Sequence, residues 1–181
     1  MLKNTAEEYG SFTKALHWLM AALIAALVIV GLYMGELDRE DPMRRELYGL
    51  HKSLGVLAML LIIVRLAWLR SSPAPALPAV FTKNESRLVS TIKTVLYVLM
   101  LLMPISGYLM SVAGGRPVSF FGLFDLPSLM GKSEGMHEFF EGAHSIMGYL
   151  IIITVLVHIA GAVKHRVKDK NGESDILKRM L

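Results

Sequence analysis

The chain has 181 residues, a formal net charge of +4 and no cysteine. Hydrophobic residue types make up 54% of it and charged types only 19%, whereas a soluble domain carries about 25% charged residues. The missing cysteines exclude a disulfide, an iron–sulfur cluster, a thiolate zinc site and a covalently attached c-type haem. Together these features favour an integral membrane protein over a soluble enzyme.

Four windows of the chain are long and apolar enough to cross a bilayer, which takes roughly 20 residues. Three of them contain no Asp, Glu, Lys or Arg, and the second contains only Arg65 between residues 53 and 69. A cleavable signal peptide is the competing interpretation of the first window, but no A-x-A-like site precedes the acidic loop at 36–41. We therefore predict spans at about 15–35, 53–70, 94–113 and 142–163.

The connections between these windows are rich in residues that end helices. A polar stretch at 36–42 follows the first window, and three prolines lie at 71–78 after the second. Gly114-Gly-Arg-Pro117 ends the third window, and a longer loop runs from there to about Glu134. This pattern predicts an all-α fold, an integral membrane four-helix up-down bundle that forms a single transmembrane domain over residues 1–181.

Lysine and arginine are unequally divided between the two ends of this bundle. The end with both termini holds 13 of them: Lys3, Lys14, Arg65, Arg70, Lys83, Arg87, Lys93, Lys164, Arg166, Lys168, Lys170, Lys178 and Arg179. The other end holds six: Arg39, Arg44, Arg45, Lys52, Arg116 and Lys132. Because cytoplasmic loops collect these residues, we expect both termini of this multi-pass membrane protein in the cytoplasm. Topology and anionic lipid account for the basic charge without a nucleic-acid partner.

Histidines lie at two depths of the predicted bundle. His144 and His158 are 14 residues apart in the fourth span, so they share a helix face and differ in depth by about 21 Å. His17 opens the first span on the inner side, at the level of His158, and His51 opens the second span on the outer side, at the level of His144. An antiparallel bundle brings each pair together across its interior.

Two imidazoles that face each other at one depth are suitable axial ligands for a haem iron. A histidine near a helix end can also simply reach the interface, and a histidine-lined metal transporter without haem is a further alternative. Arg65 follows His51 by 14 residues and is expected at the inner level, where it would neutralise haem propionates or extend to the interface. His137 and His165 are expected to be solvated surface residues, with contact to a propionate or a role in proton transfer as the alternatives. Pro104 and Gly107 can kink the third span and open room for a cofactor or a quinone.

At this point the residues resemble the bacterial cytochrome b561 family. The resemblance covers nearly the whole chain and is carried by Leu16-His-Trp18, His51-Lys-Ser-Leu-Gly55, Arg65 within Val-Arg-Leu, Leu102-Met-Pro-Ile-Ser-Gly107, His144 with His158, Lys164-His165 and Asp175-Ile-Leu-Lys-Arg-Met180. It implies two non-covalent b-type haems, with His17 and His158 as the axial ligands of one and His51 and His144 of the other. It also implies electron exchange with quinone.

The resemblance leaves more than one function open. Our first hypothesis is a dihaem electron carrier of the inner membrane coupled to the quinone pool, in its most concrete form a superoxide oxidase that reduces ubiquinone. The second is an electron-transfer subunit for a partner dehydrogenase or hydrogenase, or for another periplasmic redox protein. Superoxide would be attracted by the basic residues of the outer loops, but those loops also contain Glu36, Asp38, Glu40, Asp41, Glu46, Asp125, Glu134, Glu138 and Glu141.

Overall fold

The computed structural model describes residues 1–168 and 174–181, and in this part of the chain four long helices dominate the fold. They are α1 (Ser11–Glu36), α2 (Pro42–Ser71), α3 (Lys83–Ala113) and α4 (Glu134–Lys168). Two short antiparallel strands, β1 (Ser119–Phe120) and β2 (Phe124–Asp125), lie between α3 and α4, and a 3-10 turn, η1 (Lys178–Met180), follows α4. All four helices are long and apolar enough to cross a membrane, which confirms the predicted four-helix membrane bundle.

Each helix is longer than the apolar window that predicted it. The side chain of Asp41 caps α2 by accepting a hydrogen bond from the Met43 amide, and Pro42 occupies the first turn. A reciprocal capping box between Thr82 and Glu85 starts α3. Polar turns therefore extend α2 and α3 beyond the hydrocarbon core, where hydropathy alone gives no signal.

α2 and α3 end at the residues that the sequence marks as helix-ending. α2 ends at Ser71, directly before the proline-rich connection, and α3 ends at Ala113 with Gly114 as its cap. α4 begins at Glu134, where the long loop was expected to end. The turn between β1 and β2 places Gly122 at a φ of 72°, a left-handed conformation that glycine adopts without strain.

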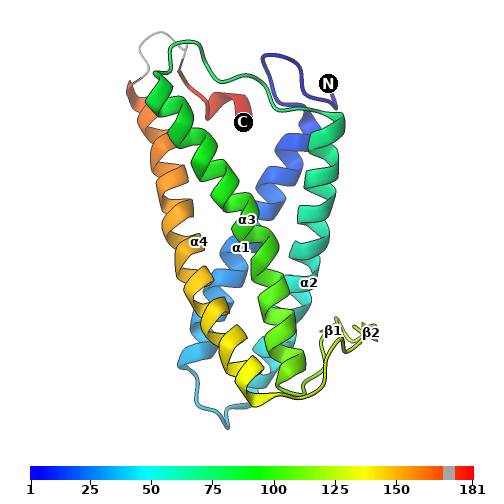
Figure 1. Cartoon of the computed structure of the whole chain (residues 1–181). Helices are drawn as coiled ribbons and strands as arrows, with labels where there is room; N and C mark the ends of the chain where they lie inside the picture. Colours follow the sequence, from blue (N-terminus) through cyan, green and yellow to red (C-terminus); the bar gives the residue numbers. More distant parts are fainter. Residues whose placement is uncertain (169–173) are drawn as a thin grey trace.

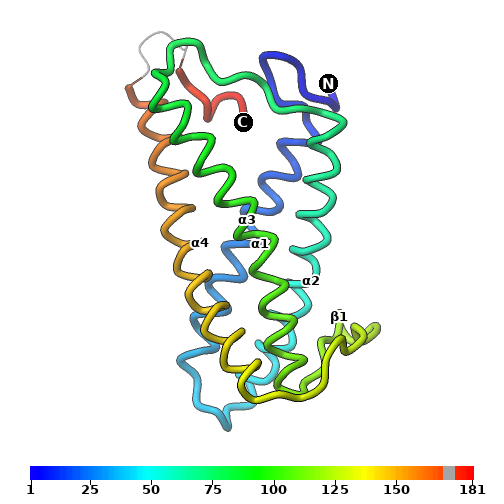
Figure 2. The backbone as a smooth tube through the Cα atoms, in the orientation of Figure 1, coloured from blue at the N-terminus to red at the C-terminus, as the bar shows by residue number. Residues whose placement is uncertain are grey.

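Successive helices run in opposite directions, so the bundle has two distinct ends (Figures 1 and 2). Both termini and the α2–α3 connection lie at one end, called here the terminal end. The α1–α2 connection and the β1–β2 hairpin lie at the other, called here the hairpin end. Large apolar side chains such as Ile29, Ile146 and Leu156 are exposed on the outer faces of the helices, as expected for residues that contact lipid.

Both ends of the chain are fixed to the terminal end of the bundle. The backbone amide nitrogen of Asn4 donates to Ser72 Oγ, and the indole Nε1 of Trp18 donates to the Met180 carbonyl. Arg179 Nη1 donates to the Ala76 carbonyl in the α2–α3 connection. Lys170, which contributed to the predicted charge asymmetry, lies outside the described residues.

Candidate functional site

The four predicted histidines form two facing pairs. The terminal pair joins His17 of α1 to His158 of α4, with ring centroids 6.3 Å apart. The hairpin pair joins His51 of α2 to His144 of α4, with ring centroids 6.2 Å apart. When two imidazoles bind one metal ion from opposite sides, each metal–nitrogen bond is about 2 Å long. Adding the distance from each nitrogen to the centre of its ring separates the two ring centres by about 6 Å. Both spacings therefore leave room for one metal ion between the rings.

The two pairs lie at different levels because α4 contributes one histidine to each. The 14 residues from His144 to His158 correspond to a rise of about 21 Å. His51 and His144 lie nine and ten residues inside the hairpin-end starts of their helices, and His17 lies six residues after the terminal-end start of α1. The structure thus brings together the same two pairs that helix direction and residue spacing predicted.

A cavity of about 840 Å³ contains the hairpin pair. It lies between the four helices, and its wall is mostly aliphatic and thioether side chains, including Val56, Met59 and Met103. Cavities of this size and character hold cofactors of drug size or larger. The described residues therefore fit a planar apolar macrocycle at this level.

Two glycines allow the hairpin-pair rings to lie against neighbouring helix backbones. A Cβ atom on Gly107 of α3 would lie 2.9 Å from Cε1 of His144, and one on Gly31 of α1 would lie 3.2 Å from Cε1 of His51. The sequence suggested that Gly107 helps to kink its helix. In the structure Gly107 leaves space for the His144 imidazole.

The ring nitrogens of the four histidines have different partners. Nδ1 of His144 lies 3.0 Å from Ser106 Oγ, and Nδ1 of His17 lies 3.4 Å from Arg65 Nη2. Nδ1 of His51 is buried without a hydrogen-bond partner among the described residues. A buried polar atom that lacks a partner is costly, and its position beside the cavity suits a site that a bound group completes.

Arg65 lies beside the terminal pair, as expected. Its Nε donates to the Tyr97 hydroxyl at 3.2 Å, and its Nη1 lies 3.9 Å from Met20 Sδ. In the described part of the chain its guanidinium forms no ion pair with a carboxylate. An arginine within a membrane bundle normally finds an anionic or carbonyl partner, so this cation fits a haem propionate as its counter-ion.

His137 and His165 lie apart from the two pairs and are not simply solvated, contrary to our expectation. Nδ1 of His137 lies 2.8 Å from the Met110 carbonyl, which joins the first turn of α4 to the last turn of α3. His165 stacks on Phe81, with ring centroids 4.2 Å apart. Both are half-buried packing residues: His137 connects α4 to α3, and His165 connects the end of α4 to the α2–α3 connection.

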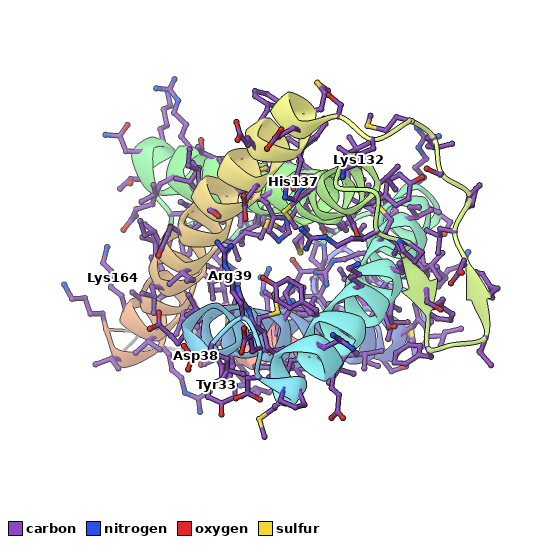
Figure 3. All side chains as sticks on the ribbon, turned by 90° about the horizontal axis from the view of Figure 1, so that it is seen from below. Tyr33, Asp38, Arg39, Lys132, His137 and Lys164 are labelled. Carbon is purple, nitrogen blue, oxygen red and sulfur yellow. The ribbon has the colours of Figure 1, made fainter. Side chains whose placement is uncertain are left out.

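Several basic residues lie at the hairpin end, which Figure 3 views directly. Arg44 and Lys52 line the cavity, together with Glu36 and Glu141. Nε of Arg44 is buried and has no hydrogen-bond partner among the described residues, whereas Lys52 Nζ donates to the Pro117 carbonyl. Arg39 instead lines a surface hollow in the α1–α2 connection. Three acidic residues line the same hollow: Asp38, Glu40 and Asp41.

Comparisons with known proteins agree with this geometry. The family described as "Prokaryotic cytochrome b561" matches residues 8–181. The chain is 35% identical over 179 residues to "Cytochrome b561 homolog 2" of Escherichia coli (strain K12). The aligned region covers 98% of this chain and 93% of the relative. The chain therefore belongs to the prokaryotic cytochrome b561 family and is a multi-pass membrane cytochrome of the b type that functions in electron transfer.

Proposed function

We propose that the protein is a dihaem cytochrome that transfers electrons across the inner membrane to or from the quinone pool. In this proposal His17 and His158 are the axial ligands of one non-covalent haem b, and His51 and His144 are the ligands of a second. The observation that carries the proposal is the pair of ring spacings, 6.3 and 6.2 Å, at two levels of one bundle. In the described residues no group of three or more His, Cys, Asp and Glu side chains suits a metal ion, which disfavours a histidine-lined metal transporter.

The haem supplies one-electron redox chemistry, and the residues of this chain determine where it is bound and how water is excluded. Neutral imidazoles from three helices each offer one nitrogen lone pair at a fixed depth. The mostly apolar wall of the cavity surrounds the hairpin pair, and Arg65 supplies a positive charge at the level of the terminal pair. We place the termini in the cytoplasm, so the hairpin end faces the periplasm.

The most concrete form of this function is a superoxide:ubiquinone oxidoreductase. Two superoxide anions would each lose one electron to become dioxygen, and one ubiquinone would gain both electrons and two protons to become ubiquinol. Arg44 and Lys52 in the cavity wall support this form, because a small anion is attracted to cations in a low-dielectric opening. Glu36 and Glu141 in the same wall reduce that attraction.

A superoxide assay tests this form of the proposal. Xanthine oxidase supplies superoxide to the purified, haem-loaded protein in the presence of ubiquinone, and ubiquinol is measured. We expect ubiquinol formation well above background, and expect it to be lost in a His144→Ala protein. Haem-loaded protein that gives only the background rate would contradict the superoxide activity. Co-purification with a larger redox protein would then favour the alternative, an electron-transfer subunit of a partner dehydrogenase or hydrogenase.

Arg65→Gln is expected to weaken retention of the haem at the terminal pair about tenfold, because it removes the charge-assisted hydrogen bond to a propionate. Transfer of haem to an excess of apomyoglobin measures this loss. Arg70→Gln is the matched control, since Arg70 lies near the end of the same helix and is exposed. Equal rates of haem loss from the two variants would contradict a propionate partner for Arg65.

A further inference from the structure

Ser106 is a buried polar residue about two turns before the C-terminal end of α3, and it contacts one candidate haem ligand. Its side chain is only 5% exposed. Its Oγ lies 2.8 Å from the Met103 carbonyl and 3.0 Å from Nδ1 of His144. The hydroxyl therefore lies between a backbone acceptor and an imidazole ring.

The two contacts together indicate which nitrogen of His144 carries the proton. A carbonyl oxygen only accepts, and the Ser106 hydroxyl donates to the Met103 carbonyl at 2.8 Å, the shorter of its two contacts. With its one hydrogen in that bond, the Ser106 oxygen accepts from His144, and we assign the donor role to Nδ1 of His144. In a neutral imidazole with a protonated Nδ1, the lone pair is on Nε2.

The other three rings do not have this arrangement. Nδ1 of His51 is buried without a partner among the described residues. Nδ1 of His17 lies 3.4 Å from Nη2 of Arg65, and a guanidinium cannot accept a hydrogen bond, so His17 has no acceptor equivalent to Ser106 there. Among the ring-nitrogen hydrogen bonds of the described residues there is none for His158. The two pairs are therefore asymmetric.

We propose that Ser106 is a positioning residue that holds His144 in the Nδ1-protonated form and lowers the reduction potential of the haem at the hairpin pair. The inference rests on the proposed function, in which His144 is an axial ligand. When the ring nitrogen that does not bind iron donates a hydrogen bond to an acceptor, the imidazole becomes a stronger electron donor to the metal. A stronger donor stabilises the oxidised iron. The terminal pair has no equivalent contact, so its potential is independent of Ser106.

The test is a spectroelectrochemical titration of the purified, haem-loaded full chain. Ser106→Ala is expected to raise the ratio of reduced to oxidised haem at the hairpin pair about three- to tenfold at a fixed ambient potential, which is about 30 to 59 mV for one electron. The haem of the terminal pair should not shift. Ser106→Thr keeps the hydroxyl and should restore the original potential, whereas Ser106→Val, of similar shape, should not.

Ser111→Ala is the matched control, because Ser111 is a buried serine of the same helix whose Oγ donates to the Arg116 carbonyl. The inference is overturned if Ser106→Ala leaves the hairpin-pair potential unchanged, or if Ser111→Ala shifts it equally. Loss of that haem in the alanine and valine variants, with retention in Ser106→Thr, supports the inference, and loss in all three overturns it. The proposed function fails separately, if His144→Ala retains both haems.

Discussion

His158→Ala is expected to remove the haem of the terminal pair and to leave the haem of the hairpin pair largely in place, and His144→Ala is expected to do the reverse. Each substitution removes one of two axial ligands from α4, while the partner ring on α1 or α2 remains. The two levels are about 21 Å apart along α4, far beyond the separation at which substitutions usually affect each other. Each variant should therefore contain one haem per chain instead of two.

Haem content per chain, measured as the pyridine haemochrome on protein of known concentration, tests this expectation. His165→Ala is the matched control on the same helix, because His165 stacks on Phe81 and lies outside both pairs. The control should retain two haems. A full complement of haem in either His158→Ala or His144→Ala would contradict the assignment of that residue as a ligand.

Gly107→Ala is expected to reduce or abolish haem binding at the hairpin pair while the helices remain folded. The added Cβ would lie 2.9 Å from Cε1 of His144, so the imidazole must move away from α3. Such a movement would change the distance between the His144 and His51 rings, and with it the site that would hold the haem iron. In other respects alanine favours a helix over glycine by about 0.5–1 kcal/mol, so the helix itself is not weakened.

The measurement is haem occupancy of each pair together with helix content by circular dichroism. Gly142→Ala is the matched control, since a Cβ at Gly142 of α4 meets nothing within 4 Å. We expect the control to bind both haems and to be at least as stable as the unmodified chain. If Gly107→Ala also bound two haems with an unchanged ferric spectrum, the close packing of the ring against α3 would have no role in ligation.

The bundle could be predicted from the sequence because its physical causes are local. Charge-free windows of about 20 residues have few structural alternatives in a membrane chain. Pro73 and Gly114 mark helix ends by backbone chemistry alone. The starts of α2 and α3 were missed, because the Asp41 cap and the Thr82 capping box lie in polar sequence outside the apolar windows. A search for capping residues upstream of each window would have located both.

The pairing of the histidines was also predictable, because it depends only on helical rise and on alternating chain direction. The contacts around the rings were not. Ser106 and Gly107 meet His144 only because α3 and α4 pack with one particular rotation about their axes, and a single sequence does not specify that rotation. A small residue next to a serine in an apolar span is a weak signal, since such residues are common in membrane helices.

The partners of His137 and His165 were also not predictable from the sequence. His137 precedes His144 by seven residues and His165 follows His158 by seven. His137 nevertheless lies against the Met110 carbonyl, and His165 stacks on Phe81. Their partners belong to the end of α3 and to the α2–α3 connection, so tertiary packing at the two ends of the bundle determines their roles.

The central claim is that two pairs of imidazoles each hold one haem. The most direct test is the reduced-minus-oxidised spectrum of the purified, unmodified chain, combined with its haem content. The account predicts two b-type haems per chain, both with the low-spin ferric signature of bis-histidine ligation. A colourless protein that does not take up added haem, or a protein with a single haem per chain at saturation, would contradict it.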